Sequence, residues 1–171
     1  MNGEMSGLRI GFGHDIHALI PDRELWLGGV RIPHSYGLKG HSDADALLHA
    51  VMDALLGAAA LGDIGMLFPD TDPAYRGISS MLLLERVMSR IEEAGFCVVN
   101  IDTVIQCESP KISPHREAIR ESLARGLRID KSRVSVKAGT NEGFDAVGER
   151  RAMVCNAVVL LESRRNVGCG R

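Results

Sequence analysis

The sequence predicts an α+β domain: a mixed β-sheet with three main helices stacked on one face. Strand-like alternation, as in residues 97–107, occurs beside helical spacing of apolar residues, as in residues 79–94. The predicted order, β-β-α-α-β-α-β-β, lacks the strict alternation of strand and helix that builds a parallel α/β sheet. At 171 residues, without an internal repeat or linker, we expect one domain over residues 1–171, with a core at about 8–161 and a loose tail at 163–171.

The composition argues against several classes of protein. Apolar residues make up 45% and charged residues 25% of the chain, which is typical of a globular domain. The formal net charge is −2, aromatic residues are 4%, and no basic run occurs, so we expect no nucleic-acid partner. Asp53 and Asp63 interrupt the longest apolar stretch, so we expect no membrane span. Residues 1–7 lack a hydrophobic signal segment, and we expect a cytoplasmic protein with reduced cysteines.

The first half of the chain is predicted to begin with two strands. The first covers residues 8–19, and the second covers residues 25–32, where two adjacent glycines indicate a bulge or a close backbone approach. A long, mostly apolar helix follows, with Ser42 as its N-cap and its end near residue 61. Residues 62–73 then form an irregular acidic loop, and a loop of this length is more often functional than idle.

The second half is predicted to alternate helices with strands. Apolar residues at helical spacing predict a helix over residues 79–94, ended by Gly95. A serine N-cap followed by a first-turn proline predicts the start of another helix at residues 113–114. The other predicted features are a strand at 97–107, the end of that helix at 125 before Gly126, a strand at 133–138, a polar loop with room for one helical turn at 139–151, and a strand apolar on both faces at 152–161.

Three side chains from two distant segments could share a metal ion. In an extended strand Asp15 and His17 point to the same face, and His49 lies on the long helix. Such ligands suit zinc, and three protein ligands leave a fourth position for substrate or water. Asp45 or Asp53, on the same helical stripe as His49, could accept from its second ring nitrogen. The alternative is that Asp15 and His17 form a solvated loop pair, while His49 is a core histidine with an internal hydrogen bond.

Two further segments could bind anions. His41 precedes the predicted helix, whose first free amides near Ser42 would attract an anion, although taken alone the segment is better explained as a simple cap with an exposed histidine. The segment 139–142 could present amides, a hydroxyl and a carboxylate to a phosphate and its cation, or form an ordinary turn. Lys111 could contact a phosphate or be solvated.

Several longer stretches point to one family. They are residues 9–17, 27–33, 41–49, 53–65, 68–73, 110–111 with 114–115, and 136–138. Together, and in this order, they resemble the 2-C-methyl-D-erythritol 2,4-cyclodiphosphate synthase family, over about residues 8–161. The resemblance implies a homotrimer of small α+β subunits with active sites between neighbours.

The resemblance also implies the chemistry of the site. The substrate would be 4-diphosphocytidyl-2-C-methyl-D-erythritol 2-phosphate of non-mevalonate isoprenoid biosynthesis. Its 2-phosphate would attack the erythritol-linked phosphate and release CMP, which is the reaction of a cyclising phosphorus–oxygen lyase. A divalent metal, usually zinc, would be held by Asp15, His17 and His49. A magnesium or manganese ion at the substrate diphosphate would be held by Glu142, and the transition state would be stabilised by His41 and Thr140.

The implied substrate-binding residues form three groups. The metal end and the methylerythritol part would be contacted by Asp15, His17, His41, Ser42, Asp63, Ile64, Gly65, Phe68, Pro69, Asp70, Thr71 and Asp72. The cytidine end would be held by Cys107, Glu108, Ser109, Pro110, Lys111, Ile112 and Ser113. The diphosphate would be held by Gly139, Thr140, Asn141 and Glu142.

The loop after Glu142 departs from the family pattern. Ala146, Glu149 and Asn156 stand where phenylalanine, arginine and glutamate are usual. In the family, the arginine and phenylalanine help form a central trimer cavity that holds isoprenoid diphosphates. We therefore expect an altered cavity here, in which Glu149 repels such anions.

Two other functions compete with the synthase interpretation. A metal-dependent hydrolase could use the same Asp/His/His site with bound water and release a linear phosphate. The second alternative is that the chain is not an enzyme but a trimeric binding or structural protein with a leftover metal site. A structural zinc site would normally be closed by a fourth protein ligand, commonly cysteine, and no cysteine lies near the three candidates in the sequence.

Overall fold

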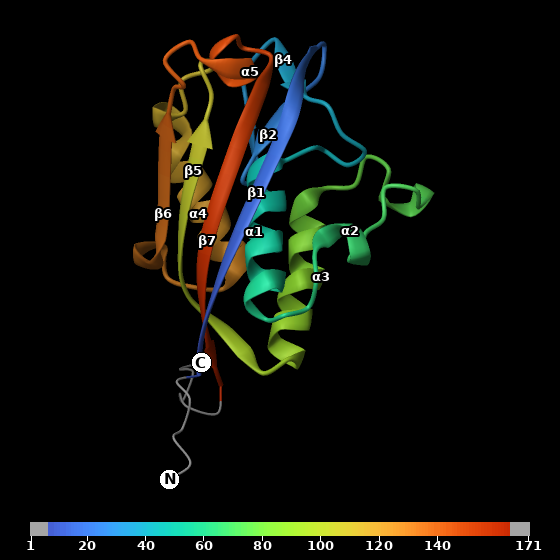
Figure 1. Cartoon of the computed structure of the whole chain (residues 1–171), viewed down its shortest axis with the longest axis vertical. Helices are drawn as coiled ribbons and strands as arrows, with labels where there is room; N and C mark the ends of the chain where they lie inside the picture. The colour runs from blue at the N-terminus through green and yellow to red at the C-terminus, as the bar shows by residue number, and fades with distance from the viewer. Residues whose placement is uncertain (1–6, 165–171) are drawn as a thin grey trace.

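The computed structural model describes residues 7–164 and contains a five-stranded sheet (Figure 1). Its strand order is β4-β1-β7-β5-β6. Only β5 and β6 pair in parallel, and the other neighbours are antiparallel, so the sheet is mixed, as predicted. The strands are β1 (Leu8–Pro21), β4 (Tyr36–Leu38), β5 (Phe96–Gln106), β6 (Val134–Gly139) and β7 (Ala152–Ser163).

Three main helices cover one face of this sheet (Figure 1). They are α1 (Ala46–Ala58), α3 (Ser80–Glu93) and α4 (Arg116–Leu127), with short helices at α2 (Ile64–Leu67) and α5 (Asp145–Gly148). The α+β fold is therefore confirmed. Most residues of α1 are buried, because this helix lies between the sheet on one side and α3 on the other. None of the helices within residues 7–164 has the length and apolar character needed to cross a membrane.

The predicted second strand is wrong in its extent. Residues 25–32 form two short strands, β2 (Leu25–Leu27) and β3 (Val30–Ile32), which pair in a hairpin. Gly28 and Gly29 make its two-residue turn with φ of 61° and 74°, a conformation that glycine adopts without a steric penalty. β4 was also missed within the expected loop, because three residues at a sheet edge leave little periodicity.

The long helix begins later than predicted. Its N-cap is Asp45, which accepts from the Leu48 amide at 3.0 Å, whereas Ser42 Oγ accepts from the Ala44 amide at 3.1 Å. The chain turns at Ala44, where φ is 58°, so the segment before it cannot join the helix. The helix also ends at Ala58 instead of near residue 61.

The end predicted for the third helix is also wrong. Gly126 lies inside α4, and the left-handed residue that ends the helix is Arg128. A Cβ at Gly126 would lie 2.7 Å from Leu84 Cδ2, so this glycine allows α4 and α3 to pack closely. At the chain end, Ser163 belongs to β7, and the rest of the expected tail from residue 165 lies outside the described residues.

Candidate metal centre and substrate pocket

The structure brings Asp15, His17 and His49 together. His17 Nε2 lies 2.8 Å and His49 Nδ1 lies 3.0 Å from Asp15 Oδ2, and the two ring nitrogens are 3.3 Å apart. β1 directs Asp15 and His17 toward the helical layer, because residues two apart on a strand share a face. α1 crosses that face and supplies His49. Within residues 7–164 these three residues form the group of His, Cys, Asp and Glu side chains that could hold a metal ion.

The spacing of these atoms fits a small divalent metal. Around a tetrahedral zinc ion, bond lengths of about 2.0–2.1 Å place neighbouring ligand atoms about 3.3 Å apart. The three observed separations of 2.8, 3.0 and 3.3 Å are close to that value. One carboxylate and two imidazoles are also donors that such an ion accepts. These residues can therefore hold the ion without moving far.

The three groups also set each other's charge. Burial by itself would raise the pKa of Asp15, but the neighbouring imidazoles of His17 and His49 outweigh it and hold this pKa well below its ordinary value. Burial by itself would lower the pKa of His17, but its hydrogen bond to Asp15 outweighs burial and raises the pKa. The carboxylate is thus ionised at neutral pH, and a metal has to compete with a proton at His17.

Each histidine contacts a polar group behind the metal-facing atoms. His17 Nδ1 lies 2.6 Å from the Lys39 carbonyl oxygen, which can only accept, so Nδ1 carries the proton and Nε2 faces the centre. His49 Nε2 lies 3.2 Å from Ser42 Oγ and 3.1 Å from Ser80 Oγ. Outer contacts of this kind orient metal-binding imidazoles.

The expectation that Asp45 or Asp53 would contact His49 is wrong. The Asp45 carboxylate accepts from the amides of Gly28, Gly29 and Leu48 at 2.7–3.0 Å. Asp53 Oδ1 accepts from the Ile64 amide at 2.9 Å. Both carboxylates are therefore used to fix the backbone beside α1. Ser80 was missed because it lies on α3, where the sequence pattern indicates only a helix start.

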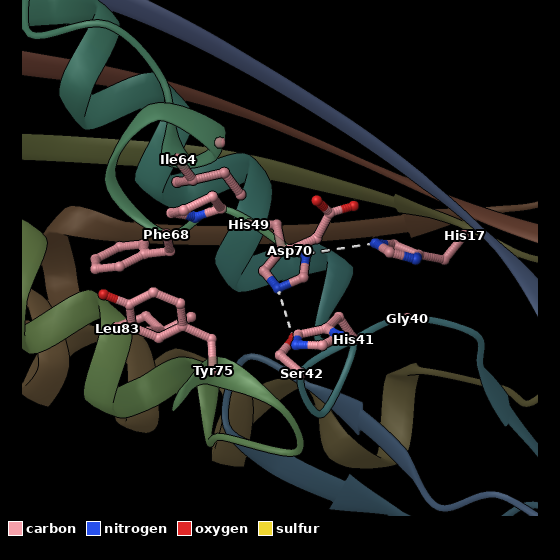
Figure 2. A pocket seen from close by; sticks show the side chains of 12 residues that line it. His17, Gly40, His41, Ser42, His49, Ile64, Phe68, Asp70, Tyr75 and Leu83 are labelled. Atoms are coloured by element: carbon pink, nitrogen blue, oxygen red, sulfur yellow. Dashed lines mark hydrogen bonds between the residues drawn. The ribbon is translucent and has the colours of Figure 1, made fainter. Parts of the chain in front are cut away.

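A cavity of about 490 Å³ opens beside the metal-binding group (Figure 2). Figure 2 shows His17, His49 and Ser42 on one side and the rings of Phe68 and Tyr75 on the other. The cavity thus has a polar and an apolar part. Of the residues expected around the methylerythritol part, those that line it are His17, His41, Ser42, Ile64, Gly65, Phe68, Pro69 and Asp70.

Four residues of that expected group do not line the cavity, and one of them is the metal-binding Asp15. Asp63 accepts from the Met66 amide and caps α2, and Asp72 accepts from the Ala74 amide and caps a 3₁₀ turn, both at 2.9 Å. Thr71 also lies outside the lining. Tyr75 and Leu83 were missed; helical spacing marks Leu83 as an ordinary core residue.

A second cavity, of about 220 Å³, lies at the ends of β5 and β6. Its lining includes most of the expected cytidine group together with Gly139 and Thr140, and adds Arg116 and Ala138. Ser109 is not part of it, and its hydroxyl lies 3.3 Å from His34 Nε2. Burial raises the pKa of the Cys107 thiol to about 11, so Cys107 is not a thiolate nucleophile at neutral pH.

Side-chain hydrogen bonds hold the segment 139–142 in place. Glu108 Oε1 accepts from the Asn141 amide at 2.8 Å, and Thr140 Oγ1 donates to Glu142 Oε1 at 2.6 Å. Asn141 and Glu142 do not line the second cavity, although Thr140 does. Glu142 is exposed and has φ of 51°, so its carboxylate is held out from a tight turn.

The metal-binding group and the second cavity lie on different strands of the sheet. In the strand register Asp15 pairs with Cys155, Cys155 with Ile105, and Ile105 with Ala138. Three strand spacings correspond to about 14 Å. Within a single chain the two features are therefore separated across the sheet by three strand spacings.

The comparisons with known proteins agree on one family. The model of the YgbB family matches residues 8–162. A 2-C-methyl-D-erythritol 2,4-cyclodiphosphate synthase of Chloroherpeton thalassium is 55% identical over 155 residues, covering 91% of this chain and 99% of that relative. One of Gloeobacter violaceus is also 55% identical over 155 residues, covering 91% and 95%. A solved 2C-methyl-D-erythritol-2,4-cyclodiphosphate synthase in its CDP-bound form has a TM-score of 0.84 and 43% identity, covering 90% of this chain and 100% of that one.

Proposed function

This chain belongs to the YgbB family, and from that premise we propose that it catalyses the 2-C-methyl-D-erythritol 2,4-cyclodiphosphate synthase reaction. One observation carries the proposal: Asp15, His17 and His49 converge on the polar side of a cavity. Within residues 7–164 the group has three members, so a metal held there keeps a coordination position for the substrate. We place the activity in the cytoplasm, as the sequence predicts.

The reaction needs positioning and charge neutralisation more than a protein nucleophile. An oxygen of the substrate's 2-phosphate forms a bond to the erythritol-linked phosphorus, and the bond from that phosphorus to the CMP oxygen breaks. CMP leaves with the electron pair. Alignment of the two phosphates in one pocket can supply an effective concentration on the order of 10⁵ M. Displacement at phosphorus depends mostly on such alignment and on electrostatics.

We assign the metal-binding group to zinc. A bound zinc ion supplies a Lewis acid that offsets phosphate charge. His41 lines the same cavity and would contact the substrate phosphates there. Cys107 is buried with a raised pKa, and no covalent step is assigned to it.

We assign Glu142 to a magnesium or manganese ion at the substrate diphosphate. Its exposed carboxylate and the neighbouring Thr140 hydroxyl are oxygen donors, which such ions prefer. Thr140 also lines the second cavity, where Lys111 lies. We therefore place the cytidine end in the second cavity and the methylerythritol part in the cavity beside the metal-binding group.

A homotrimer would join these two parts of the site. The substrate must contact both, yet within one chain they are separated by about 14 Å of sheet. The sheet face that carries no helix, called the open face below, exposes Ile10, Phe12 and Ile16 on β1 together with Val158 on β7. An apolar surface of this kind is typical of an interface. We propose that neighbouring copies pack through this face and complete each other's site.

Of the three departures from the family pattern, Asn156 lies on β7, whereas Ala146 lies in α5 and Glu149 directly follows that helix. Asn156 Nδ2 donates to Gln106 Oε1 at 3.2 Å, and Asn156 Oδ1 lies 2.9 Å from His14 Nδ1. Arg151 forms an ion pair with Glu149. Glu149 is therefore partly neutralised within its own chain. The expectation that the central cavity rejects isoprenoid diphosphates stays a prediction, and native mass spectrometry showing bound farnesyl diphosphate would contradict it.

The proposed function is tested by CMP release from the diphosphocytidyl substrate. Metal-free protein should release no CMP, and added zinc with magnesium should restore the release. His49→Ala should lose turnover and zinc while keeping the native oligomer. CMP release that survives complete zinc removal would overturn the proposal. An unfolded His49→Ala chain would instead indicate a structural metal.

A further inference from the structure

We propose that Ser80, held by Asp43, positions His49 as a metal ligand by determining which of its ring nitrogens carries the proton. The proposal rests on the proposed function only in taking the group of Asp15, His17 and His49 as a metal site. It assigns Ser80 and Asp43 a positioning role outside the ligand set. Neither residue was expected to act here from the sequence.

The hydrogen bonds around Ser80 run in one direction. Ser80 is the first residue of α3 and is fully buried. Its amide donates to Asp43 Oδ2 at 2.8 Å, and its hydroxyl donates to Asp43 Oδ1 at 2.5 Å. A hydroxyl has one proton. Because Ser80 donates that proton in a hydrogen bond to Asp43, its oxygen can only accept a hydrogen bond from His49. His49 Nε2, which lies 3.1 Å from it, must then carry a proton.

The opposite nitrogen of His49 is thereby left free for a metal. A neutral imidazole with its proton on Nε2 has a lone pair on Nδ1. That atom lies 3.0 Å from Asp15 Oδ2 and 3.3 Å from His17 Nε2. The other tautomer would point an N–H bond at Asp15 and fill the space that the ion needs. The Lys39 carbonyl acts in the same way on His17. In both imidazoles, an acceptor on the far side of the ring thus holds the proton away from the metal-facing nitrogen.

Ser42 does not provide this selection, although its Oγ lies 3.2 Å from the same nitrogen. This oxygen accepts from the Ala44 amide, and among residues 7–164 no carboxylate accepts its own proton. It can therefore donate to an unprotonated Nε2 or accept from a protonated one, and it suits either tautomer. The difference between the two serines is the Asp43 carboxylate.

The chain fixes Asp43 and Ser80 relative to each other, although they are 37 residues apart. The Asp43 amide donates to the Ile78 carbonyl at 3.0 Å, and the Gly77 amide donates to the His41 carbonyl at 2.8 Å. The segments that lead into α1 and α3 are thus joined by backbone hydrogen bonds. Because Ser80 begins α3, the start of this helix is part of the support of the metal site.

The test compares zinc binding and the His49 tautomer in four full-length proteins. They are the unmodified chain, Ser80→Ala, Asp43→Asn and the control Ser89→Ala. Ser89 lies on the same helix, is exposed, and donates to the Glu85 carbonyl. Zinc affinity is measured by competition with a chelator. The tautomer is read from ¹⁵N chemical shifts of the ring nitrogens of His49 in the metal-free and zinc-loaded proteins.

We expect Ser80→Ala to weaken zinc binding by about 10–100-fold, the range seen when an outer partner of a metal ligand is lost. Its metal-free His49 should shift toward the form with the proton on Nδ1. Asp43→Asn should shift both readouts in the same direction, because an amide can donate to Ser80 Oγ and turn the Ser80 hydroxyl proton toward His49 Nε2. Ser89→Ala should match the unmodified chain.

The proposal is overturned if Ser80→Ala binds zinc within about twofold of the unmodified chain and keeps the proton of His49 on Nε2. Circular dichroism checks that the variants are folded. Should Ser80→Ala not fold, Asp43→Asn decides by the same two readouts, and unchanged values would reject the proposal. Neither readout requires turnover, so failure here is distinct from failure of the synthase assignment.

Discussion

Gly13 on β1 lies directly against the backbone of Ala50 on α1: a Cβ at Gly13 would be 1.9 Å from the Ala50 carbonyl oxygen. Gly11 has the same relationship with the carbonyl oxygen of Ala54, one helical turn further on. Both contacts are far shorter than real Cβ contacts allow, so each strand position requires glycine. The close approach places His49, the neighbour of Ala50, over Asp15 and His17.

Gly13→Ala should therefore damage both the fold and the metal centre. The added methyl group would push α1 away from β1, because it meets a backbone oxygen that cannot rotate aside. We expect a loss of about 3 kcal/mol or more of unfolding free energy, at the upper end of overpacking effects. Zinc affinity should fall in the folded fraction. Urea unfolding and chelator competition measure the two effects.

Gly57→Ala, on the packed helix α1 itself, is the matched control. A Cβ at Gly57 would meet nothing within 4 Å, and alanine is favoured over glycine inside a helix by about 0.5–1 kcal/mol. This variant should be as stable as the unmodified chain or slightly more so. Equal stability of the two glycine variants would contradict the close-packing argument.

The fold could be predicted from the sequence because its long elements have strong periodicity. Alternating residues in β5 and apolar spacing in α3 depend on local sequence alone. The start of α1 could not be predicted in the same way. Ser42 is a good N-cap by type, but Asp45 takes that position because it also binds the glycine amides of a hairpin. That partner is specified only by the tertiary fold.

The site also contains residues that local sequence predicts and residues that only the tertiary fold specifies. The alternation of β1 predicts that Asp15 and His17 share a face, and helix packing brings His49 to them. The contacts behind His49 come from Ser42 and from the start of α3, which no spacing in the sequence connects with it. Similarly, Asp63 and Asp72 suit a polar ligand by type, yet the structure uses them as caps.

Zinc binding should weaken as the pH falls. The pKa of metal-free His17 is raised by its hydrogen bond to Asp15, and a metal binds only the unprotonated nitrogen. Below this raised pKa zinc affinity should fall steadily with pH, because the His17 proton must leave before the metal binds. The pKa of Asp15 is held low, so Asp15 adds no proton between about pH 5 and pH 8.

Calorimetry in buffers of different ionisation enthalpy measures this proton directly. More protons should be released per zinc at about pH 6 than at about pH 8, because the proton on His17 is lost as the pH rises past its raised pKa. A zinc affinity that is flat from about pH 6 to pH 8 would show that His17 does not titrate in competition with the metal.

Glu142→Gln should raise the magnesium concentration needed for half-maximal activity by at least about tenfold, because a carboxylate ligand is lost. Zinc affinity should not change, since Glu142 is not one of the three residues around the zinc position. Glu149→Gln, in the same loop but paired with Arg151, is the control and should leave the magnesium requirement unaltered. A loss of zinc in Glu142→Gln would argue against two separate ions.

Ile10→Glu should prevent trimer assembly without unfolding the chain. Ile10 is 74% exposed on the open face of the sheet, so glutamate is tolerated in one chain but would be buried in an assembly through that face. Leu82→Glu is the control, because Leu82 is 50% exposed on α3. Sedimentation velocity should give a smaller species for the first variant alone. If both variants sediment as the unmodified chain does, the open face is not the interface.

The most direct test of the central claim is phosphorus NMR of the products made from 4-diphosphocytidyl-2-C-methyl-D-erythritol 2-phosphate by the zinc-loaded protein with magnesium. We expect the cyclic diphosphate and CMP to appear together in equal amounts, with no inorganic phosphate. A linear phosphate product, or CMP without the cyclic diphosphate, would show that water attacks instead of the 2-phosphate and would contradict the proposed cyclisation.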